Sequence, residues 1–222
     1  MMLLVVGGHT RNIGKTSVAA GLIAATRELN WTAVKITQFG HGTCSSEGEA
    51  CECAVEDPAH PFAVTEEHDR ASGTDSSRFL AAGAQRSYWV RTAAGQLGHA
   101  LPALGRIFDS SVHAMVESNS ILQFVRPEIY LAVLDFVAED FKPTGLKYLD
   151  RADAVVLIRR GAERERWTGV ARKLWDSKPR FYVEPPQYVT EAMAAWVRGR
   201  ANSSATSSRG LPGGTSERTE RP

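Results

Sequence analysis

The sequence has few cysteines, almost no net charge and no long apolar run. Its three cysteines lie between positions 44 and 53 of 222 residues, which excludes the disulfide framework of a small secreted protein. The formal net charge of +1 gives no electrostatic sign of a nucleic-acid or membrane partner. The N-terminal apolar run MMLLVV is too short for a transmembrane helix and lacks the basic start of a secretory signal. We therefore expect a cytoplasmic protein.

The composition is that of an ordinary globular domain, except at its end. Hydrophobic residues make up 43% and charged residues 23% of the chain, which is enough to build one well-buried domain. Residues 199–222 contain almost no large apolar side chain and cannot bury enough surface to fold. We expect a folded domain over residues 1–198 and a disordered tail over 199–222.

Short apolar runs alternate with amphipathic stretches, which predicts an α/β fold with a mostly parallel sheet flanked by helices on both faces. The predicted strands are Met2–Val6, Thr32–Thr37, Val112–Glu117, Ile129–Leu134, Ala154–Ile158 and Phe181–Val183. The predicted helices are Lys15–Leu29, Ser76–Ser87, Gln96–Phe108 and Thr190–Val197. Residues 38–73 exceed an ordinary connection, so we expect a functional insertion or a small substructure there.

A glycine-rich segment, GGHTRNIGKTS from Gly7 to Ser17, joins the first predicted strand to the first predicted helix. Strand, glycine-rich turn, Gly-Lys-Thr and helix is the context of a P-loop, which wraps the phosphates of ATP or GTP. Amide groups and the helix N-terminus would face the phosphates, with a lysine charge and a threonine hydroxyl for Mg²⁺ beside them. The predicted nucleotide-binding residues are Gly8, His9, Thr10, Arg11, Asn12, Ile13, Gly14, Lys15, Thr16 and Ser17.

The loop departs from the usual spacing, because His9 stands where a P-loop has glycine and Gly8 lies one residue earlier. This longer form resembles the G-T-x-T-x-V-G-K-T loop of dethiobiotin synthetases, and VKITQFG over 34–40 resembles Y-K-P-V-Q-T-G of that family. GTDSSRFLAAGA over 73–84 resembles instead the K-D-S-x-R-H-x-x-A-G-A stretch of MobB-like proteins, which act in molybdopterin-guanine dinucleotide biosynthesis. Both families belong to one branch of P-loop NTPases.

The two resemblances imply different functions. The MobB-like one implies an NTPase that assists biosynthesis of a molybdopterin-type cofactor. The other implies an ATP-dependent ligase or kinase that acts on a small acid. Either resemblance implies a homodimer.

Two carboxylates are candidates for the Mg²⁺ site beside Thr16. Glu117 ends a buried strand, where it could hold the ion, although a strand-end glutamate could also face water. Asp75 begins a predicted helix and could be its N-terminal cap. The MobB-like pattern implies instead that Asp75 serves the metal or phosphate site. With Lys15, both acids are also candidates for catalysis.

Lys35 is a further catalytic candidate, because it interrupts an apolar strand. By resemblance it faces the phosphates or an acidic substrate. The alternative is a side chain that lies along the sheet with its amine in water. Arg78 could pair with a phosphate or with Asp75.

All cysteines gather near one histidine: the candidate ligands are Cys44, Cys51, Cys53 and His41. Thiolates and imidazole suit Zn²⁺ or an Fe–S cluster, which would make the protein a nucleotide-gated carrier of metal or cluster. Reduced thiols that pack a loop are the alternative.

The remaining features separate the functions less well. Trp89, Trp167, Trp175 and Trp196 fall at predicted helix or strand positions, which is typical of core residues. The guanine-reading N-K-x-D pattern is absent, and RRG over 159–161 follows the strand where it would stand. ATP and GTP are therefore not distinguished.

Overall fold

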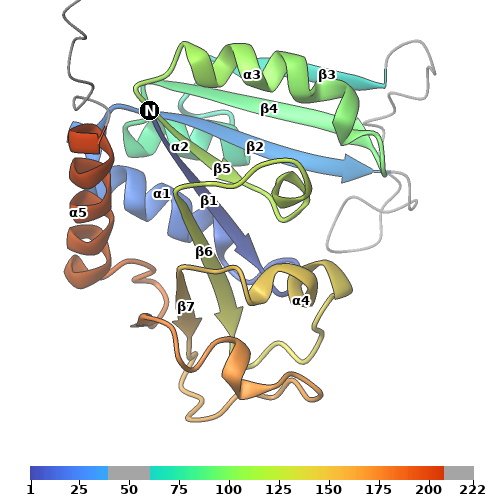
Figure 1. The fold of residues 1–222 in the computed structure, drawn as a ribbon, viewed down its shortest axis with the longest axis vertical. Helices are drawn as coiled ribbons and strands as arrows, with labels where there is room; N and C mark the ends of the chain where they lie inside the picture. The colour runs from blue at the N-terminus through green and yellow to red at the C-terminus, as the bar shows by residue number, and fades with distance from the viewer. Residues whose placement is uncertain (40–60, 208–222) are drawn as a thin grey trace, which may run out of the picture.

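The fold is built on one sheet whose strands run in the order β3-β4-β2-β5-β1-β6-β7-β8 (Figure 1). In the computed structural model, residues 1–39 and 61–207 are described. The strands are β1 (Met2–Gly8), β2 (Trp31–Phe39), β3 (Phe62–Glu67), β4 (Arg86–Ala93), β5 (His113–Glu117), β6 (Ile129–Asp135), β7 (Ala154–Ile158) and β8 (Arg180–Val183). All neighbouring strands of this sheet are parallel except β3 and β4.

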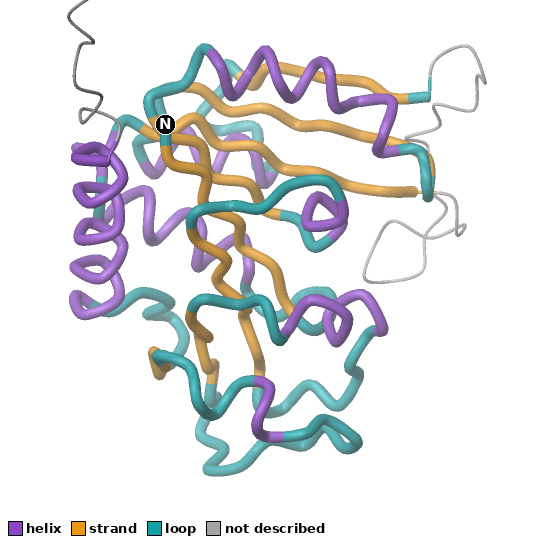
Figure 2. The backbone as a smooth tube through the Cα atoms, viewed as in Figure 1, coloured by secondary structure: helices purple, strands orange, loops and turns teal. Residues whose placement is uncertain are grey.

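Helices cover both faces of the sheet, which confirms the predicted fold class (Figures 1 and 2). The helices on one face are α1 (Lys15–Ala25), α2 (Asp75–Ala82) and α5 (Glu191–Ser207), and those on the other are α3 (Leu101–Asp109) and α4 (Pro143–Leu149). Short 3₁₀ turns occur at Arg27–Leu29, Leu97–Ala100, Ser120–Gln123 and Arg172–Leu174. None of the helices within 1–39 and 61–207 has the length and hydrophobicity that crossing a bilayer requires.

The central strand β1 contributes to two separate hydrophobic cores. Leu3 and Val5 pack with the side chains of α3 and α4, whereas Leu4 and Val6 pack with those of α1 and α5. Successive strand residues point to opposite faces, so a strand covered on both sides must be apolar throughout. This requirement explains why β1, β6 and β7 read as continuous apolar runs.

β3 and β4 occupy residues for which no strand is predicted. The helix predicted over Ser76–Ser87 ends at Ala82, because Gly83 adopts a left-handed conformation with φ of 114° and caps the helix. β4 then begins at Arg86, whose guanidinium pairs with Glu66 on β3 at 2.8 and 2.9 Å. β3 therefore gives the long segment predicted over 38–73 an ordered part, the antiparallel edge of the sheet.

The last helix is longer than predicted. α5 runs to Ser207, past the boundary at residue 198 that the composition predicts. Ala201 is buried beside Val197 in the core, and Arg198 donates to the carbonyl of Ala25 at 2.6 Å. These contacts anchor a segment whose polar composition alone would not predict a helix.

We expect Gly145→Ala to destabilise the fold, because α4 packs against the segment after β1 with no room for a side chain. A Cβ at Gly145 would lie 2.7 Å from His9 Cα and 2.9 Å from the His9 carbonyl oxygen. The free energy of unfolding should fall by about 1–3 kcal/mol, as in other overpacked cores. Gly105→Ala in α3 is the control, since nothing lies within 4 Å of its Cβ. The free energy of unfolding of Gly105→Ala should rise by up to about 1 kcal/mol, because alanine favours a helix more than glycine does. Urea denaturation measures the free energy of unfolding of both variants. An equal fall in both would contradict the close packing at Gly145.

Candidate functional site

The segment between β1 and α1 bends around a cavity at the carboxyl edge of the sheet. Gly14 adopts a left-handed conformation with φ of 91°, and a Cβ there would lie 2.5 Å from the ring of Tyr188. Gly8 is also restricted, because its Cβ would lie 2.8 Å from Ile13 Cδ1 and 3.0 Å from the Val133 carbonyl oxygen. Both glycines are therefore needed for this path of the backbone.

The cavity has a volume of about 1000 Å³, at the upper end for small-molecule sites. The predicted loop residues that line it are Gly8, Thr10, Arg11, Asn12, Gly14, Lys15, Thr16 and Ser17. The charged lining residues are the cations Arg11, Lys15, Lys35, Arg78, Lys142 and Arg160 and the acids Asp75 and Glu117. Six cations against two acids give a cavity suited to a polyanion.

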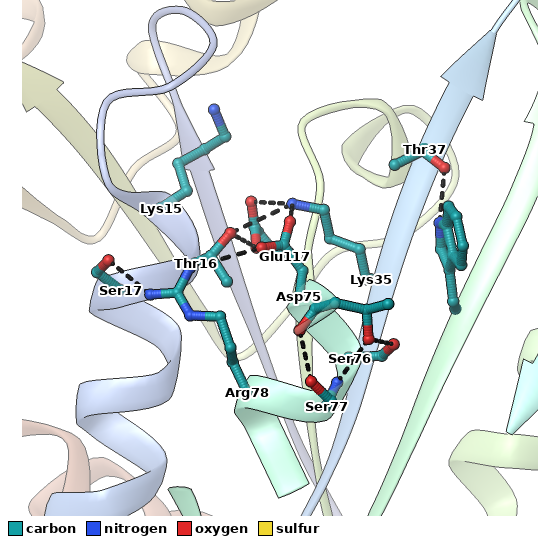
Figure 3. A network of polar contacts seen from close by, with 12 residues as sticks. Lys15, Thr16, Ser17, Lys35, Thr37, Asp75, Ser76, Ser77, Arg78 and Glu117 are labelled. Atoms are coloured by element: carbon teal, nitrogen blue, oxygen red, sulfur yellow. Dashed lines mark hydrogen bonds and ion pairs between the residues drawn. The ribbon is translucent and has the colours of Figure 1, made fainter. Parts of the chain in front are cut away.

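Four predicted site residues that line this cavity meet in one polar network (Figure 3). The Lys35 ammonium lies 2.6 Å from Glu117 Oε1 and 2.7 Å from Asp75 Oδ2. The Thr16 hydroxyl donates to Glu117 Oε2 at 2.8 Å and lies 3.4 Å from the Lys35 ammonium. Residues from α1, β2, α2 and β5 thus converge on one point.

The register of the sheet produces this convergence. Lys35 of β2 pairs with Glu117 of β5, so the two side chains lie next to each other on the face that α1 and α2 cover. Parallel strands end at the same edge of a sheet, which places both residues beside the start of α1. Side chains far apart in the sequence therefore form one site.

The contacts decide between the alternatives that the sequence left open. Glu117 is only 3% exposed, so it does not face water. Thr74 rather than Asp75 caps α2, because its hydroxyl accepts the Ser77 amide, while Asp75 binds Lys35. The Lys35 ammonium contacts two acids and does not lie free in solvent. Arg78 contacts Asp75 at 3.6 Å and donates to the Ser17 hydroxyl at 3.0 Å.

Burial and pairing set the protonation of the two lysines differently. Burial lowers the pKa of Lys15 to about 8, and the nearby charges of Lys35 and Lys142 act in the same direction. Burial also disfavours the charged forms of Lys35 and Asp75. Pairing outweighs burial in both: the pKa of Lys35 is raised by Glu117 and Asp75, and the pKa of Asp75 is lowered by Lys35. The cavity therefore holds one lysine neutralised by acids and one, Lys15, suited to an added anion.

Two predicted nucleotide-binding residues do not line the cavity, His9 and Ile13. Ile13 is 2% exposed and packs in the core beneath α1. The fully buried His9 ring lies 4.9 Å from the ring of Phe141 and 5.0 Å from that of Trp167. Its Nε2 accepts the Asp135 amide at 3.1 Å. These two buried side chains support the loop on the side that faces away from the cavity.

Three contacts of the site have no counterpart in the sequence predictions. The Asn119 amide binds both backbone groups of Gly8, accepting from its N–H at 2.8 Å and donating to its carbonyl at 2.7 Å. Arg160 donates to Asp135 at 2.6 Å, and Lys142 donates its backbone amide to His9 at 2.9 Å. Their position in the sequence could have identified two of these residues, because Asn119 and Arg160 each follow a buried strand by two residues.

The cysteine segment lies outside the described residues. Cys44, Cys51, Cys53 and His41 fall there, so the Zn²⁺ or Fe–S site stays a prediction. In residues 1–39 and 61–207, no group of three or more His, Cys, Asp and Glu side chains could hold a metal ion.

Neither a protein-family model nor a curated protein matches this chain. Among solved structures, HypB from Helicobacter pylori in complex with nickel is 12% identical, with a TM-score of 0.49 over 90% of this chain and 87% of that one. LpxK from Aquifex aeolicus in complex with ATP is 15% identical, with a TM-score of 0.47 over 82% of this chain and 53% of that one. Likeness at this level assigns neither a family nor a ligand to this chain.

His9 should make the stability of the protein sensitive to acid. Burial lowers its pKa from 6.5 to about 4, so below pH 6.5 the unfolded chain binds a proton that the folded chain does not. The free energy of unfolding should therefore fall between pH 7 and pH 4.5, with about 2–3 kcal/mol of the loss due to His9. His9→Gln can still accept the Asp135 amide but does not titrate. Urea denaturation at both pH values should show a smaller loss in this variant.

The control is His99→Gln, which replaces an exposed histidine and should keep the wild-type loss between the two pH values. An identical pH dependence in His9→Gln and wild type would contradict the buried, neutral state of His9.

Proposed function

We propose that this chain binds a nucleoside triphosphate with Mg²⁺ in the cavity and cleaves its terminal phosphate bond. The supporting observation is that the loop carrying Lys15 and the network of Thr16, Lys35, Asp75 and Glu117 line the same cationic cavity. Phosphoryl transfer requires mainly positioning and neutralisation of charge, and both are available here.

The loop is suited to the phosphates. α1 begins directly after Gly14, so the amide groups of its first turn lie at the cavity, where they favour an anion. Lys15 donates to the Thr10 carbonyl at 2.5 Å across the loop. Its charge would stabilise the phosphate oxygens at the bond that breaks.

The oxygen donors of the network fit Mg²⁺, which prefers hard oxygen ligands and often takes only one or two carboxylates from a protein. Thr16, Glu117 and Asp75 supply a hydroxyl and two carboxylates, and the contacts of both carboxylates with the Lys35 ammonium support a preference for a cation here. When bound, the ion would neutralise charge on the terminal phosphates.

The remaining charged groups have assignable roles. Asp75 is half-exposed, with 39% of its side chain accessible, so it can orient a water molecule or an acceptor while Glu117 stays buried. Lys35 lowers the pKa of Asp75 and would contact the terminal phosphate. Catalysis in this proposal depends on placement rather than on a covalent intermediate.

The proposal also includes a more specific biochemical role. The contact between Asp75 and Lys35 supports the MobB-like alternative, because that resemblance gives Asp75 a role at the metal or phosphate site. We accordingly propose an accessory NTPase of molybdopterin-type cofactor biosynthesis. The dethiobiotin-synthetase-like ligase is the second candidate, supported by the position of Lys35 in the lining of the cavity.

Lys15→Ala should weaken binding of a non-hydrolysable ATP or GTP analogue. Loss of a charge-assisted hydrogen bond costs about 1.5–3 kcal/mol, which corresponds to about 10–150-fold in Kd. Isothermal titration calorimetry measures the effect. Lys173→Ala is the control, because it removes an exposed lysine of the 3₁₀ turn at Arg172–Leu174. Unchanged affinity in Lys15→Ala would exclude the loop as a phosphate site.

Glu117→Gln should remove the Mg²⁺ dependence of the site. A neutral amide is a weaker ligand for a hard cation, so the gain in nucleotide affinity on adding Mg²⁺ should fall at least tenfold, by roughly 1.4 kcal/mol or more. Phosphate release should fall about 100-fold or more, in the range of other losses of charge stabilisation. Glu66→Gln changes a glutamate on the edge strand β3 and should behave as wild type. An intact Mg²⁺ effect in Glu117→Gln would remove Glu117 from the metal site.

A further inference from the structure

Lys35 contacts all three side chains that the proposed function assigns to Mg²⁺ (Figure 3). Its ammonium lies 2.6 Å from Glu117 Oε1 and 2.7 Å from Asp75 Oδ2, and it donates to the Thr16 hydroxyl at 3.4 Å. An ammonium has three N–H donors, and these three side chains accept one each. Lys35 and the proposed metal site therefore depend on the same set of side chains.

The charge of this set balances one of the two cations but not both. When ionised, Glu117 and Asp75 together carry the charge that neutralises one Mg²⁺. The side chains of Glu117 and Lys35 are only 3% and 15% accessible, so water and salt screen their charges little. A divalent ion beside the Lys35 ammonium would therefore leave a positive charge uncompensated in a buried place, which is unfavourable.

Among the described residues that line the cavity, Asp75 and Glu117 are the only acids that Lys35 could contact. On the side away from β5, Lys35 pairs with Trp89 of β4, which lines the cavity and not the core, where the sequence predicts it. The Arg91 guanidinium lies 4.7 Å from the centre of the Trp89 ring, so this side adds a cation rather than a carboxylate. An ammonium displaced by Mg²⁺ would therefore need an anion that a ligand supplies.

A nucleoside triphosphate would supply that anion. Lys15 and the rest of the loop line the same cavity as Lys35. The flexible four-carbon stem of a lysine lets its ammonium change partners, and phosphate oxygens accept strong hydrogen bonds from it. Mg²⁺ that arrives with a triphosphate thus comes with a new partner for Lys35, whereas Mg²⁺ alone does not.

We propose that Lys35 sets the order of binding: its ammonium excludes Mg²⁺ from Thr16, Asp75 and Glu117 until a triphosphate draws it away. This inference rests on the proposed nucleotide binding and gives Lys35 a selective role within it. The site takes up the metal ion together with the triphosphate and not before it. Binding of the two is therefore coupled, and each strengthens the other by the same factor.

The exclusion is tested by titrating Mn²⁺, which prefers the same oxygen ligands as Mg²⁺, into the full chain without nucleotide. Electron paramagnetic resonance measures the concentration of the free ion. Lys35→Met removes the ammonium and should bind Mn²⁺ about tenfold or more tightly than wild type does. Lys35→Arg keeps the positive charge and should bind Mn²⁺ as weakly as wild type.

Two further variants separate this exclusion from a general effect of charge. Lys142→Met removes a lysine that lines the cavity just before α4, and it should change the Mn²⁺ affinity less than about threefold. Lys35→Met combined with Glu117→Gln should lose the tight binding, because the metal ion then lacks its buried carboxylate. An equal rise in Lys142→Met and Lys35→Met would overturn the inference, since net charge would then explain it.

A measurement on the wild-type protein tests the inference even if Lys35→Met does not fold. NMR of protein with ¹⁵N-labelled lysine follows the signal of the Lys35 ammonium, which is assigned by its loss in Lys35→Arg. Mg²⁺ alone should leave this signal unchanged, and Mg²⁺ with a non-hydrolysable ATP or GTP analogue should shift it. A shift with Mg²⁺ alone, or no shift when both are bound, would overturn the order of binding.

The outcomes separate this inference from the proposed function. Equal Mn²⁺ affinity in wild type and Lys35→Met overturns the selective role of Lys35 although the nucleotide analogue binds. Failure of both analogues to bind wild type overturns the proposed function. The Mn²⁺ titrations contain no nucleotide, so they then still test whether Lys35 excludes a metal ion.

Discussion

The Lys35 ammonium between Glu117 and Asp75 is the interaction on which the site depends. It connects β2, β5 and α2, and Thr16 adds the start of α1. Lys35 holds both carboxylates at one point and lowers the pKa of Asp75. Oxygen donors that are already fixed would need little rearrangement in the proposed phosphoryl transfer.

This network requires the strand order of the sheet. β1 lies between β5 and β6, and β2 lies beside β5, so the loop, Glu117 and Lys35 meet at one carboxyl edge. Asn119 then fixes the last residue of β1 through both of its backbone groups. Because a β-carbon at Gly7 would lie 2.2 Å from Asn119 Oδ1, the backbone can approach this amide only at glycine. Gly7 and Gly8, which mark the loop in the sequence, thus also permit the close contact with Asn119 at the end of β1.

Local patterns predicted the centre of the fold and failed at its edge. β1, β6 and β7 are buried on both faces and read as apolar runs of strand length. In β4 only Tyr88, Trp89 and Val90 are apolar in succession, between polar residues on either side, and β3 is half-exposed, so neither gives a run of strand length. The helix predicted across Ser76–Ser87 obscured the start of β4. Only the left-handed Gly83 marks the break, and glycine alone does not distinguish a cap from a tolerated helix residue.

The residues of the site also divide into those that local sequence patterns identified and those that they did not. Lys15, Thr16, Asp75 and Glu117 could be selected because each carries charge or a hydroxyl at or beside the end of a predicted element, and Lys35 because it interrupts an apolar strand. The contacts of Asn119 and Arg160 join residues more than 20 positions apart, and no local pattern encodes such pairs. Trp89 faces the cavity because of its register with Lys35, which depends on how β2 and β4 pair. A tryptophan in an apolar stretch gives no such information.

His9 shows how the loop accommodates its unusual spacing. The residue that stands in place of glycine turns its side chain away from the cavity, into a pocket of Phe141 and Trp167. Its carbonyl accepts the Lys142 amide, so the same residue positions the segment from which Lys142 and Thr144 line the cavity. The extra residue thus packs against the protein interior, and the next residue, Thr10, lines the cavity again. A longer loop can keep a phosphate-binding shape provided that its extra residue is anchored on the opposite side.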